Sequence, residues 1–458
     1  MLQLDIDKWA EQNFGECELG DARRTKRTVK LAAQVAARPD GSTPEQTEIW
    51  ADCKAAYRLF DQDDLTFEAL CEPHWQRTRS QMSGTWLLIG DTTEIEFGYD
   101  RAVSGLGPTG NGSRDGFFLH SSLMINAETE EVAGLARAEL FHRQPAPKKE
   151  TLRQKKNRDR ESEVWGRVID RVGPPPESAH FVHVFDAGAD NFEVFCHLQM
   201  QQCGWVVRAA QKHRIVRDET GRRTPLLRLV RQQPLAGTYE LSLRSRKNQS
   251  ARTATIEVRF APMTMPLPAQ KTPFMKKCGI TEIAMWVVEA REVNAPRGVE
   301  PLHWVLLTSE PVQSFDDAWV VIGWYEKRPV VEDYHKCLKT GCRVEHRQYA
   351  TSDRLERVTG LLSVVAVRLL QLKFVARSEP DRPAARVVPS AWLCMLKALR
   401  KRNRHINTVG EFFRSLAMLG GFLGRKHDGQ PGWITIWRGF EKLILCIRGA
   451  DAMYKKCG

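Results

Sequence analysis

The chain has 458 residues, of which 42% are hydrophobic and 27% are charged, so its composition excludes a wholly disordered protein and its length predicts roughly two to four domains. Lysine and arginine outnumber aspartate and glutamate by 68 to 56, which gives a net charge of +12 and favours a polyanionic partner. The 11 cysteines contain no C-x-x-C pair, which favours reduced thiols in a cytosol over disulfides or a zinc site.

Residues 1–75 have the pattern of compact helices. Asp21 is placed to cap one of these helices, which has an apolar face and must end near Pro39. The first turns of that helix carry a basic cluster, made of Arg23, Arg24, Lys26 and Arg27. Such a cluster suits contacts with DNA phosphates, whereas a solvated charged face is the simpler alternative for an isolated run. The first residues lack the basic start and apolar stretch of a signal peptide.

After residue 80 the pattern changes to short apolar runs that predict strands, over residues 85–97, 116–126 and 181–185. Asp91 and Asp186 each follow the apolar part of such a run. We expect both strands to end there, so that the two side chains converge at one edge of a sheet. An aspartate in this position is more often a turn former or a helix cap, and that alternative stays open for each residue alone.

The middle of the chain mixes predicted loops with further strands. Residues 105–113 are rich in glycine but lack the G-K-[ST] ending of a phosphate-binding loop, so we expect a surface loop. Residues 145–165 form a charged connector that is predicted to become helical near its end. Between about 215 and 310 short β-rich pieces alternate with proline and glycine turns, which predicts an inserted sheet.

Two helices are predicted near residue 330, and the second one carries a third acid. Ser314 and Asp317 have the spacing of a capping box, and Pro329 fits the first position of a second helix that runs to Thr340. On that second helix three residues share a face at i, i+4 and i+7, namely Glu332, Lys336 and Lys339. The glutamate is either an ordinary ion-pair partner or a metal ligand beside cations that grip a phosphate backbone.

The remaining chain is predicted to be helical and basic. The most apolar segment, residues 358–372, is interrupted by Arg368, whereas a bilayer span needs about 20 apolar residues, so we expect a buried helix. Gly420 and Gly421 mark a possible hinge in the C-terminal helices.

Two aspartates on strands and one glutamate on a helix are the ligands with which an RNase H-like core holds two divalent metals. Carboxylate oxygens suit Mg²⁺, which keeps open positions for water and phosphate. The residues alone therefore favour metal-dependent phosphoryl transfer.

Four of these residues also carry a resemblance. Tyr325, Arg328, Glu332 and Lys339 reproduce the pattern Y-x2-R-x3-E-x6-K, which resembles the signature of the bacterial DDE transposases of the fourth insertion-sequence family. The resemblance continues through "LGDARRTKR", "AAYRLF", "DTT", "FLHSSL", "PLHWVLLTSEPV", "HKCLKTG", "VAVRLLQL" and "LGGFLGRK", and so spans nearly the whole chain. The family often has an aromatic residue after the arginine, where this chain has Pro329, which would move the helix start.

The resemblance implies a role for each candidate residue. It makes Asp91, Asp186 and Glu332 the catalytic triad, which holds two Mg²⁺ ions, with Mn²⁺ as a substitute. It implies DNA contacts for Tyr325, Arg328, Lys336, Lys339, Arg208 and the basic cluster of residues 23–27. Trp304 becomes the platform on which a flipped base stacks, although a core tryptophan is the commoner role.

The implied fold is an α/β protein with an RNase H-like catalytic core, residues 76–375, that carries the β-rich insertion. Helical domains flank this core: an end-binding domain over residues 1–75 and a dimerisation region over residues 376–458. The implied activity is cut-and-paste transposition, with strand nicking, hairpin formation and resolution, and strand transfer into target DNA. We expect a homodimer on double-stranded DNA, in the bacterial cytoplasm and without a membrane partner. A nuclease that cuts without joining, and an inactive DNA-binding relative that inhibits transposition, remain alternatives.

Overall fold

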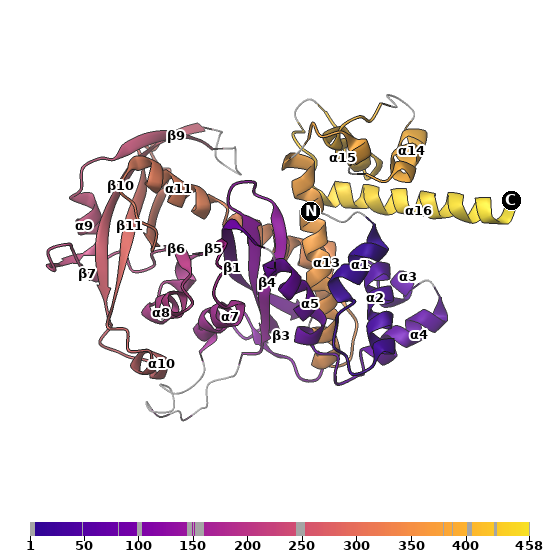
Figure 1. The fold of residues 1–458 in the computed structure, drawn as a ribbon, viewed down its shortest axis with the longest axis horizontal. Coiled ribbons are helices and arrows are strands. Elements are labelled where there is room, and N and C mark those ends of the chain that lie inside the picture. The colour runs from indigo at the N-terminus through magenta and orange to yellow at the C-terminus, as the bar shows by residue number, and fades with distance from the viewer. Residues whose placement is uncertain are drawn as a thin grey trace.

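Two groups of helices and one large sheet make up the structure (Figure 1). This computed structural model describes residues 5–47, 49–80, 82–98, 103–143, 149, 151, 160–243, 252–378, 380–386, 388–400, 405–425 and 428–457. The long helix α13, Ser352–Ser378, contacts both the N-terminal helices and the C-terminal ones. The chain is therefore a mixed α/β protein with helices at both ends.

The N-terminal helices follow the local sequence signals. They are α1 (Ile6–Phe14), α2 (Ala22–Ala37), α3 (Thr43–Thr47), α4 (Trp50–Leu59) and α5 (Phe67–Arg79). The predicted cap of α2 is confirmed, because the Asp21 carboxylate accepts a hydrogen bond of 2.8 Å from the backbone N–H of Arg23. The helix ends two residues before Pro39, and Ala32 and Ala36 lie fully buried on its inner face. Alanine gives α2 both its helical propensity and its close packing.

The strands form one mixed sheet. Among the described residues they are β1 (Gly84–Phe97), β2 (Gly107–Thr109), β3 (Arg114–Asn126), β4 (Val132–Phe141), β5 (Ala179–Phe185), β6 (Gly204–Arg208), β7 (Ile215–Arg217), β8 (Arg223–Pro225), β9 (Gly237–Leu243), β10 (Arg252–Pro266), β11 (Glu282–Val293) and β12 (His303–Thr308). Their order is β2-β3-β1-β5-β6-β12-β11-β10-β7-β8, with β4 beside β3 and β9 beside β10. Of the strand pairs that the structure describes, β1–β5 and β5–β6 are parallel and the others are antiparallel.

Side chains alternate between the two faces of the central strands, as the strand period requires. Leu87 and Ile89 of β1 belong to the core that includes residues of α5 and α13, whereas Leu88 belongs to the core on the other face. That second core includes residues of α7, Val164–Val172, and α8, Phe192–Met200. Both faces of the central sheet are thus covered by helices, which explains why β1 reads as an apolar run rather than an alternating one.

Three segments in the middle of the chain were predicted to be a surface loop, a charged connector and an inserted sheet. Residues 105–113 are not all loop, because Gly107–Thr109 forms β2 and pairs with β3. The helical end of the charged connector is confirmed by α7, but most of residues 145–159 lie outside the described residues. The β-rich segment after residue 215 is present, and it also contains helices α9 (Leu226–Arg231) and α10 (Pro273–Lys277). Its last strand, β12, pairs with β6, so the insertion extends the central sheet.

The two helices near residue 330 begin as predicted and end differently. The capping box of α11, Phe315–Glu326, is confirmed, since Ser314 and Asp317 bond to each other's backbone. Helix α12 begins at Pro329 but stops at Lys336, and the chain continues as a π-helix over Cys337–Gly341. The wider π-turn changes the angular spacing between successive residues, so the predicted single α-helix to Thr340 is wrong in its last turn.

The C-terminal region is helical, as expected. It contains α14 (Ser390–Leu399), α15 (Val409–Leu419) and α16 (Trp433–Cys457), and the buried segment 358–372 lies within α13. Gly420 is a packing position rather than a hinge, because a Cβ atom there would lie 1.9 Å from the carbonyl oxygen of Thr435 in α16. In the part of the chain that is described, no helix is long and apolar enough to cross a membrane.

Buried histidines make the stability of this fold sensitive to acid. The N–H of Leu135 donates to His74 Nε2 over 3.1 Å, so the Nδ1–H group donates to Asn13 over 2.7 Å and the ring is neutral. Burial lowers the pKa of His74 to about 3, and burial lowers the pKa of three further histidines, 120, 183 and 335, to about 3 as well. A group whose folded pKa lies below its unfolded value of 6.5 stabilises the fold fully above pH 6.5 and loses that contribution as the pH falls.

We therefore expect the free energy of unfolding to fall between pH 6.5 and pH 5 by about 1.4 kcal/mol per pH unit for each such histidine. Urea unfolding of wild type and of His74→Gln at several pH values measures how steeply the free energy of unfolding depends on pH. The slope for the variant should be smaller by the contribution of one histidine. The matched control is His346→Gln, since His346 is exposed. Equal slopes for wild type and His74→Gln would contradict the prediction.

Candidate active site

The sheet places Asp91 and Asp186 side by side. Strand β1 was predicted to end at Asp91. This is wrong, because antiparallel pairing with β3 extends the strand to Phe97. The parallel pairing of β1 with β5, however, ends at Ile89, which lies opposite Val184. Continuing that register by two residues brings Asp186, the first residue after β5, next to Asp91. The two aspartates therefore meet where the parallel pairing stops, at the edge where ligands bind in open α/β sheets.

Helix α12 adds Glu332 to the two aspartates through one shared cation. The Arg328 guanidinium lies 3.0 Å from the Asp91 carboxylate and 3.4 Å from that of Asp186. Its other terminal nitrogen donates to Glu332 one helical turn away. Three carboxylates from three separate elements thus converge on one guanidinium, and the predicted grouping of the three acids is present in this form.

Burial and mutual repulsion shape the electrostatics of the three acids. Burial raises the pKa of Asp91 to about 6, and the negative charges of Asp186 and Glu332 add to the rise. Arg328 and the backbone N–H of Thr92, which donates to Asp91 over 2.8 Å, oppose it. For Arg328, burial disfavours the charged form, but the three carboxylates outweigh burial and raise its pKa. The acids therefore need a cation between them, and the guanidinium provides one.

The donor set of this site fits a divalent cation. Three carboxylates supply hard oxygen ligands of the kind that Mg²⁺ and Mn²⁺ accept. Within the described ranges no three His, Cys, Asp or Glu side chains lie close enough together to hold a metal ion. At the three acids, the Arg328 guanidinium lies between the carboxylates. Sequence reasoning kept an ion pair as an alternative role for Glu332, which its spacing of four residues from Arg328 allows. It assigned Arg328 to DNA and did not foresee the contacts of Arg328 with Asp91 and Asp186.

Three of the predicted DNA-contact residues gather beside Asp186. The ring of Trp304 in β12 packs edge-on against Tyr325 at the end of α11, with centroids 5.6 Å apart. Arg208 ends β6, which pairs with β12, and its charge lies near enough to Tyr325 to lower the pKa of the hydroxyl group against the larger effect of burial. Burial raises the pKa of Tyr325, and the charge of Asp186 adds to this effect. Trp304 is half-buried, so its ring is partly accessible from outside.

The two lysines of the predicted helix face do not contact the acids. Lys336 is exposed and lies 3.7 Å from Asp333 on its own helix. Lys339 follows the change to π-helix and forms an ion pair of 3.1 Å with Glu345. The cations beside Glu332 therefore do not form one continuous face, because the π-turn separates them.

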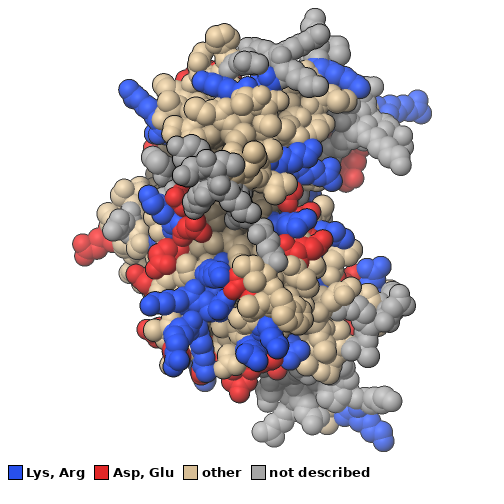
Figure 2. Space-filling model, turned by 90° about the vertical axis from the view of Figure 1, so that its right-hand side faces the viewer, with Lys and Arg blue, Asp and Glu red and all other residues tan. Residues whose placement is uncertain are grey.

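The basic cluster of α2 is divided between structural and exposed cations. Arg24 forms an ion pair of 2.6 Å with Asp64, and Arg27 forms one of 2.8 Å with Asp52. Arg23 and Lys26 are exposed, and the Arg23 side chain keeps 92% of its surface. On the face that contains α3 and α4, lysine and arginine side chains gather in the lower half (Figure 2). Sequence reasoning missed exposed Lys30, which follows Lys26 at helical spacing.

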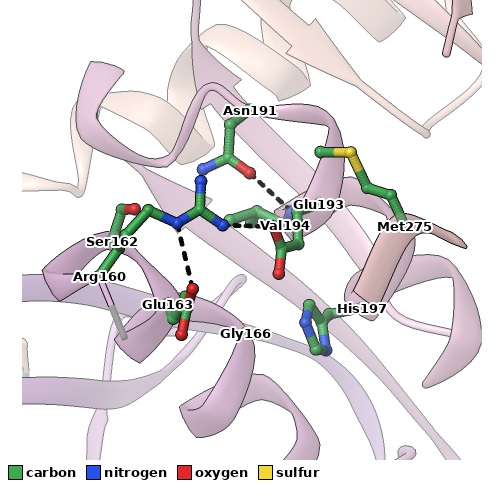
Figure 3. Close-up of a pocket in the computed structure, with 9 residues that line it drawn as sticks. All are labelled: Arg160, Ser162, Glu163, Gly166, Asn191, Glu193, Val194, His197 and Met275. Atoms are coloured by element: carbon green, nitrogen blue, oxygen red, sulfur yellow. Dashed lines mark hydrogen bonds and ion pairs between the residues drawn. The ribbon is translucent and has the colours of Figure 1, made fainter. Parts of the chain in front are cut away.

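A cavity on the α7–α8 side does not contain the candidate acids (Figure 3). It has a volume of about 100 Å³ and is lined by Arg160, Ser162, Glu163, Gly166, Asn191, Glu193, Val194, His197 and Met275. Arg160 crosses it, with ion pairs of 3.1 Å to both Glu163 and Glu193. Its charges are paired with one another, so we do not assign it a ligand.

Comparisons with known protein families match the two ends of the chain. A family described as transposase DNA-binding matches residues 6–65, and one described as transposase Tn5 dimerisation domain matches residues 364–457. Both matches are to transposase domains, and they support a DNA-transposing enzyme that binds DNA and forms dimers. The second match makes the chain similar to a Tn5-type transposase. The three acids lie outside both matched ranges, so their role rests on the geometry described above.

Proposed function

We propose that this chain is a cut-and-paste DNA transposase whose catalytic residues are Asp91, Asp186 and Glu332. The observation that carries the proposal is the convergence of these three carboxylates on one cation, Arg328. The strand order β4-β3-β1-β5-β6, with three antiparallel strands followed by two parallel neighbours, supports an RNase H-like core. In such a core the acids lie on the first strand, after the next parallel strand and on a following helix, as they do here.

In this proposal the three carboxylates hold two Mg²⁺ ions, for which Mn²⁺ can substitute. When bound, such a pair activates the attacking oxygen and stabilises the leaving oxygen of an in-line displacement at phosphorus. The chain itself fixes the ligands: Thr92 orients Asp91 through its backbone N–H, and the cap position of Asp186 fixes its carboxylate against the N–H of Gly188, over 2.8 Å.

The residues around the acids position the DNA. Trp304, Tyr325 and Arg208 form an aromatic and cationic cluster beside Asp186, in which Trp304 and Arg208 are half-buried and Tyr325 is buried. We assign the transposon end to this cluster, with Arg208 and Tyr325 on phosphates and Trp304 against a flipped base, a contact worth roughly 1 to 3 kcal/mol. Lys336 at the end of α12 and Lys339 in the π-helix that follows are assigned to DNA as two separate contacts. Arg328 moves from the acids to the DNA backbone when the metal ions enter.

The reaction sequence consists of substitutions at phosphorus. Water first forms a P–O bond at the transposon end as the bond to the 3′ oxygen breaks, which leaves a 3′ hydroxyl. That hydroxyl attacks the opposite strand to give a hairpin, water opens the hairpin, and the freed 3′ hydroxyl then joins target DNA. Each step exchanges one P–O bond for another, so one carboxylate site serves them all.

The test uses the full chain with linear DNA that carries the inverted repeats flanking its own gene, together with a supercoiled target and Mg²⁺. Nicked ends, hairpins and target joints on one gel are the expected products. Cleavage without joints would show a nuclease instead, and end binding without cleavage would show an inactive relative.

A second copy of the chain completes the proposed complex. The dimerisation match covers α14, α15 and α16, and α16 exposes Leu445 at 71% and Met453 at 70% of their surfaces. These apolar side chains on one long helix suit helix-to-helix packing between two chains on paired transposon ends.

A further inference from the structure

One exposed aromatic residue stands out in the N-terminal helices. Trp50, the first residue of α4, keeps 73% of its surface, which makes it the most exposed large apolar side chain among the described residues. Its neighbour Ile49 keeps 62%. A single exposed apolar residue is common, but an exposed tryptophan beside an exposed isoleucine marks a contact surface.

The position of Trp50 is fixed against the basic helix α2. Asp52, two positions after Trp50 in α4, is only 7% exposed and binds three side chains of α2. Lys30 lies 2.7 Å and Arg27 2.8 Å from its carboxylate, and Gln34 donates to it over 3.1 Å. These bonds, led by the one from Lys30, lower the pKa of Asp52 to about 2, so the clamp stays charged at neutral pH. The start of α4, which carries Trp50, is therefore fixed against α2.

Cations continue from this clamp along α2. Arg23, Lys26 and Lys30 are exposed and follow one another at helical spacings of three and four residues. Trp50 lies two positions before Asp52, the residue that binds Lys30 of this stripe, and both helices lie within the range that matches a transposase DNA-binding domain. An apolar tip flanked by phosphate-binding cations is the arrangement with which proteins enter a groove of DNA.

We propose that Trp50, supported by Ile49, is an apolar wedge that enters a groove of the transposon end while the α2 stripe holds the flanking phosphates. This inference rests on the proposed function, because it names how the N-terminal helices read the DNA that the acids cut. The indole contributes an uncharged contact, by stacking on a base or packing on sugars. Its contribution to affinity is therefore independent of salt, unlike that of the stripe.

DNA is the occupant that the surroundings favour over a second copy of the chain. The flanking side chains are cations, which complement phosphate and would repel the same stripe on another copy. The apolar surface suited to a partner chain lies elsewhere, on α16, within the range that matches a dimerisation domain.

The test measures binding of full-length chain to a fluorescent transposon-end duplex at several salt concentrations in a metal chelator. Trp50→Ala should weaken binding by roughly 5- to 150-fold with an unchanged slope of log affinity against log salt. Arg23→Ala with Lys26→Ala should instead reduce the slope by about 0.9 for each cation that contacts a phosphate. Met200→Ala is the matched control, because Met200 is 54% exposed on α8, and it should bind like wild type.

The outcomes separate this inference from the proposed function. If the cation variant loses affinity and Trp50→Ala does not, the wedge is wrong while end binding by α2 stands. If neither changes, the N-terminal helices do not bind the end, and that part of the proposed function fails. A melting temperature equal to that of wild type shows that Trp50→Ala is folded, and Trp50→Phe, which keeps an aromatic ring, should restore part of the affinity. A change of oligomeric state without loss of affinity would overturn the choice of DNA as occupant.

Discussion

Glu332→Gln is expected to abolish Mg²⁺-dependent nicking and to leave end binding intact. The substitution keeps the size of the side chain but removes a negative charge that the metal ions require. Metal stabilisation of the transition state is worth several kcal/mol, so nicking should fall by about three orders of magnitude. Gel assays of nicking in Mg²⁺, and of end binding in a chelator, measure the two properties separately.

The ion pair with Arg328 offers an alternative role for Glu332, and the same experiment distinguishes the two. A purely structural glutamate predicts a lowered melting temperature and activity that falls only with the folded fraction. Glu326→Gln is the matched control, since Glu326 is exposed at the end of α11 and contacts none of the three acids. Substantial nicking by well-folded Glu332→Gln would remove this residue from the catalytic set.

The other two acids should reproduce this pattern. Asp91→Asn and Asp186→Asn each remove one carboxylate from the same site, so each alone is expected to lower nicking as far as Glu332→Gln does. The combination of any two should cost little more than one, because residues that act as a unit give non-additive effects.

Arg328→Ala is expected to let divalent metal bind without DNA. In the structure the guanidinium lies between the three carboxylates, where its charge balances theirs. Metal must displace it, and a DNA phosphate is the natural acceptor for the displaced guanidinium. Metal binding and DNA binding should therefore assist each other in wild type, by a factor typical of coupled sites, roughly 5- to 150-fold.

Titration of the DNA-free protein with Mn²⁺, followed by electron spin resonance, measures this coupling directly. Arg328→Ala should bind Mn²⁺ more tightly than wild type, while nicking falls because a DNA contact is lost. Arg328→Lys should lie between them, since an ammonium group lacks the planar fork that reaches several carboxylates. Lys336→Ala controls for general loss of positive charge and should bind Mn²⁺ like wild type. Equal Mn²⁺ affinity of Arg328→Ala and wild type would contradict the displacement mechanism.

The sequence by itself determined the local features of this protein. Caps at Asp21 and Ser314, the helix start at Pro329 and the buried helix around residues 358–372 all follow from short-range patterns. Each depends on residues within one or two turns, so no distant contact is needed to predict it. Local context and the spacing around Glu332 also singled out the three acids as candidates, and their catalytic role stays a prediction.

The tertiary structure decided what those features do together. Asp91 was expected to end a strand, yet pairing with β3 extends the strand, and only the register with β5 places it beside Asp186. Arg328 contacts Asp91 across 237 positions of sequence and Asp186 across 142. Arg24, Arg27 and Lys30 turned out to be paired with acids of neighbouring segments, and Lys30 stays exposed together with Arg23 and Lys26. These outcomes depend on which side chains the folded sheet and helices bring within reach of each other's charges, and local sequence does not encode such long-range contacts.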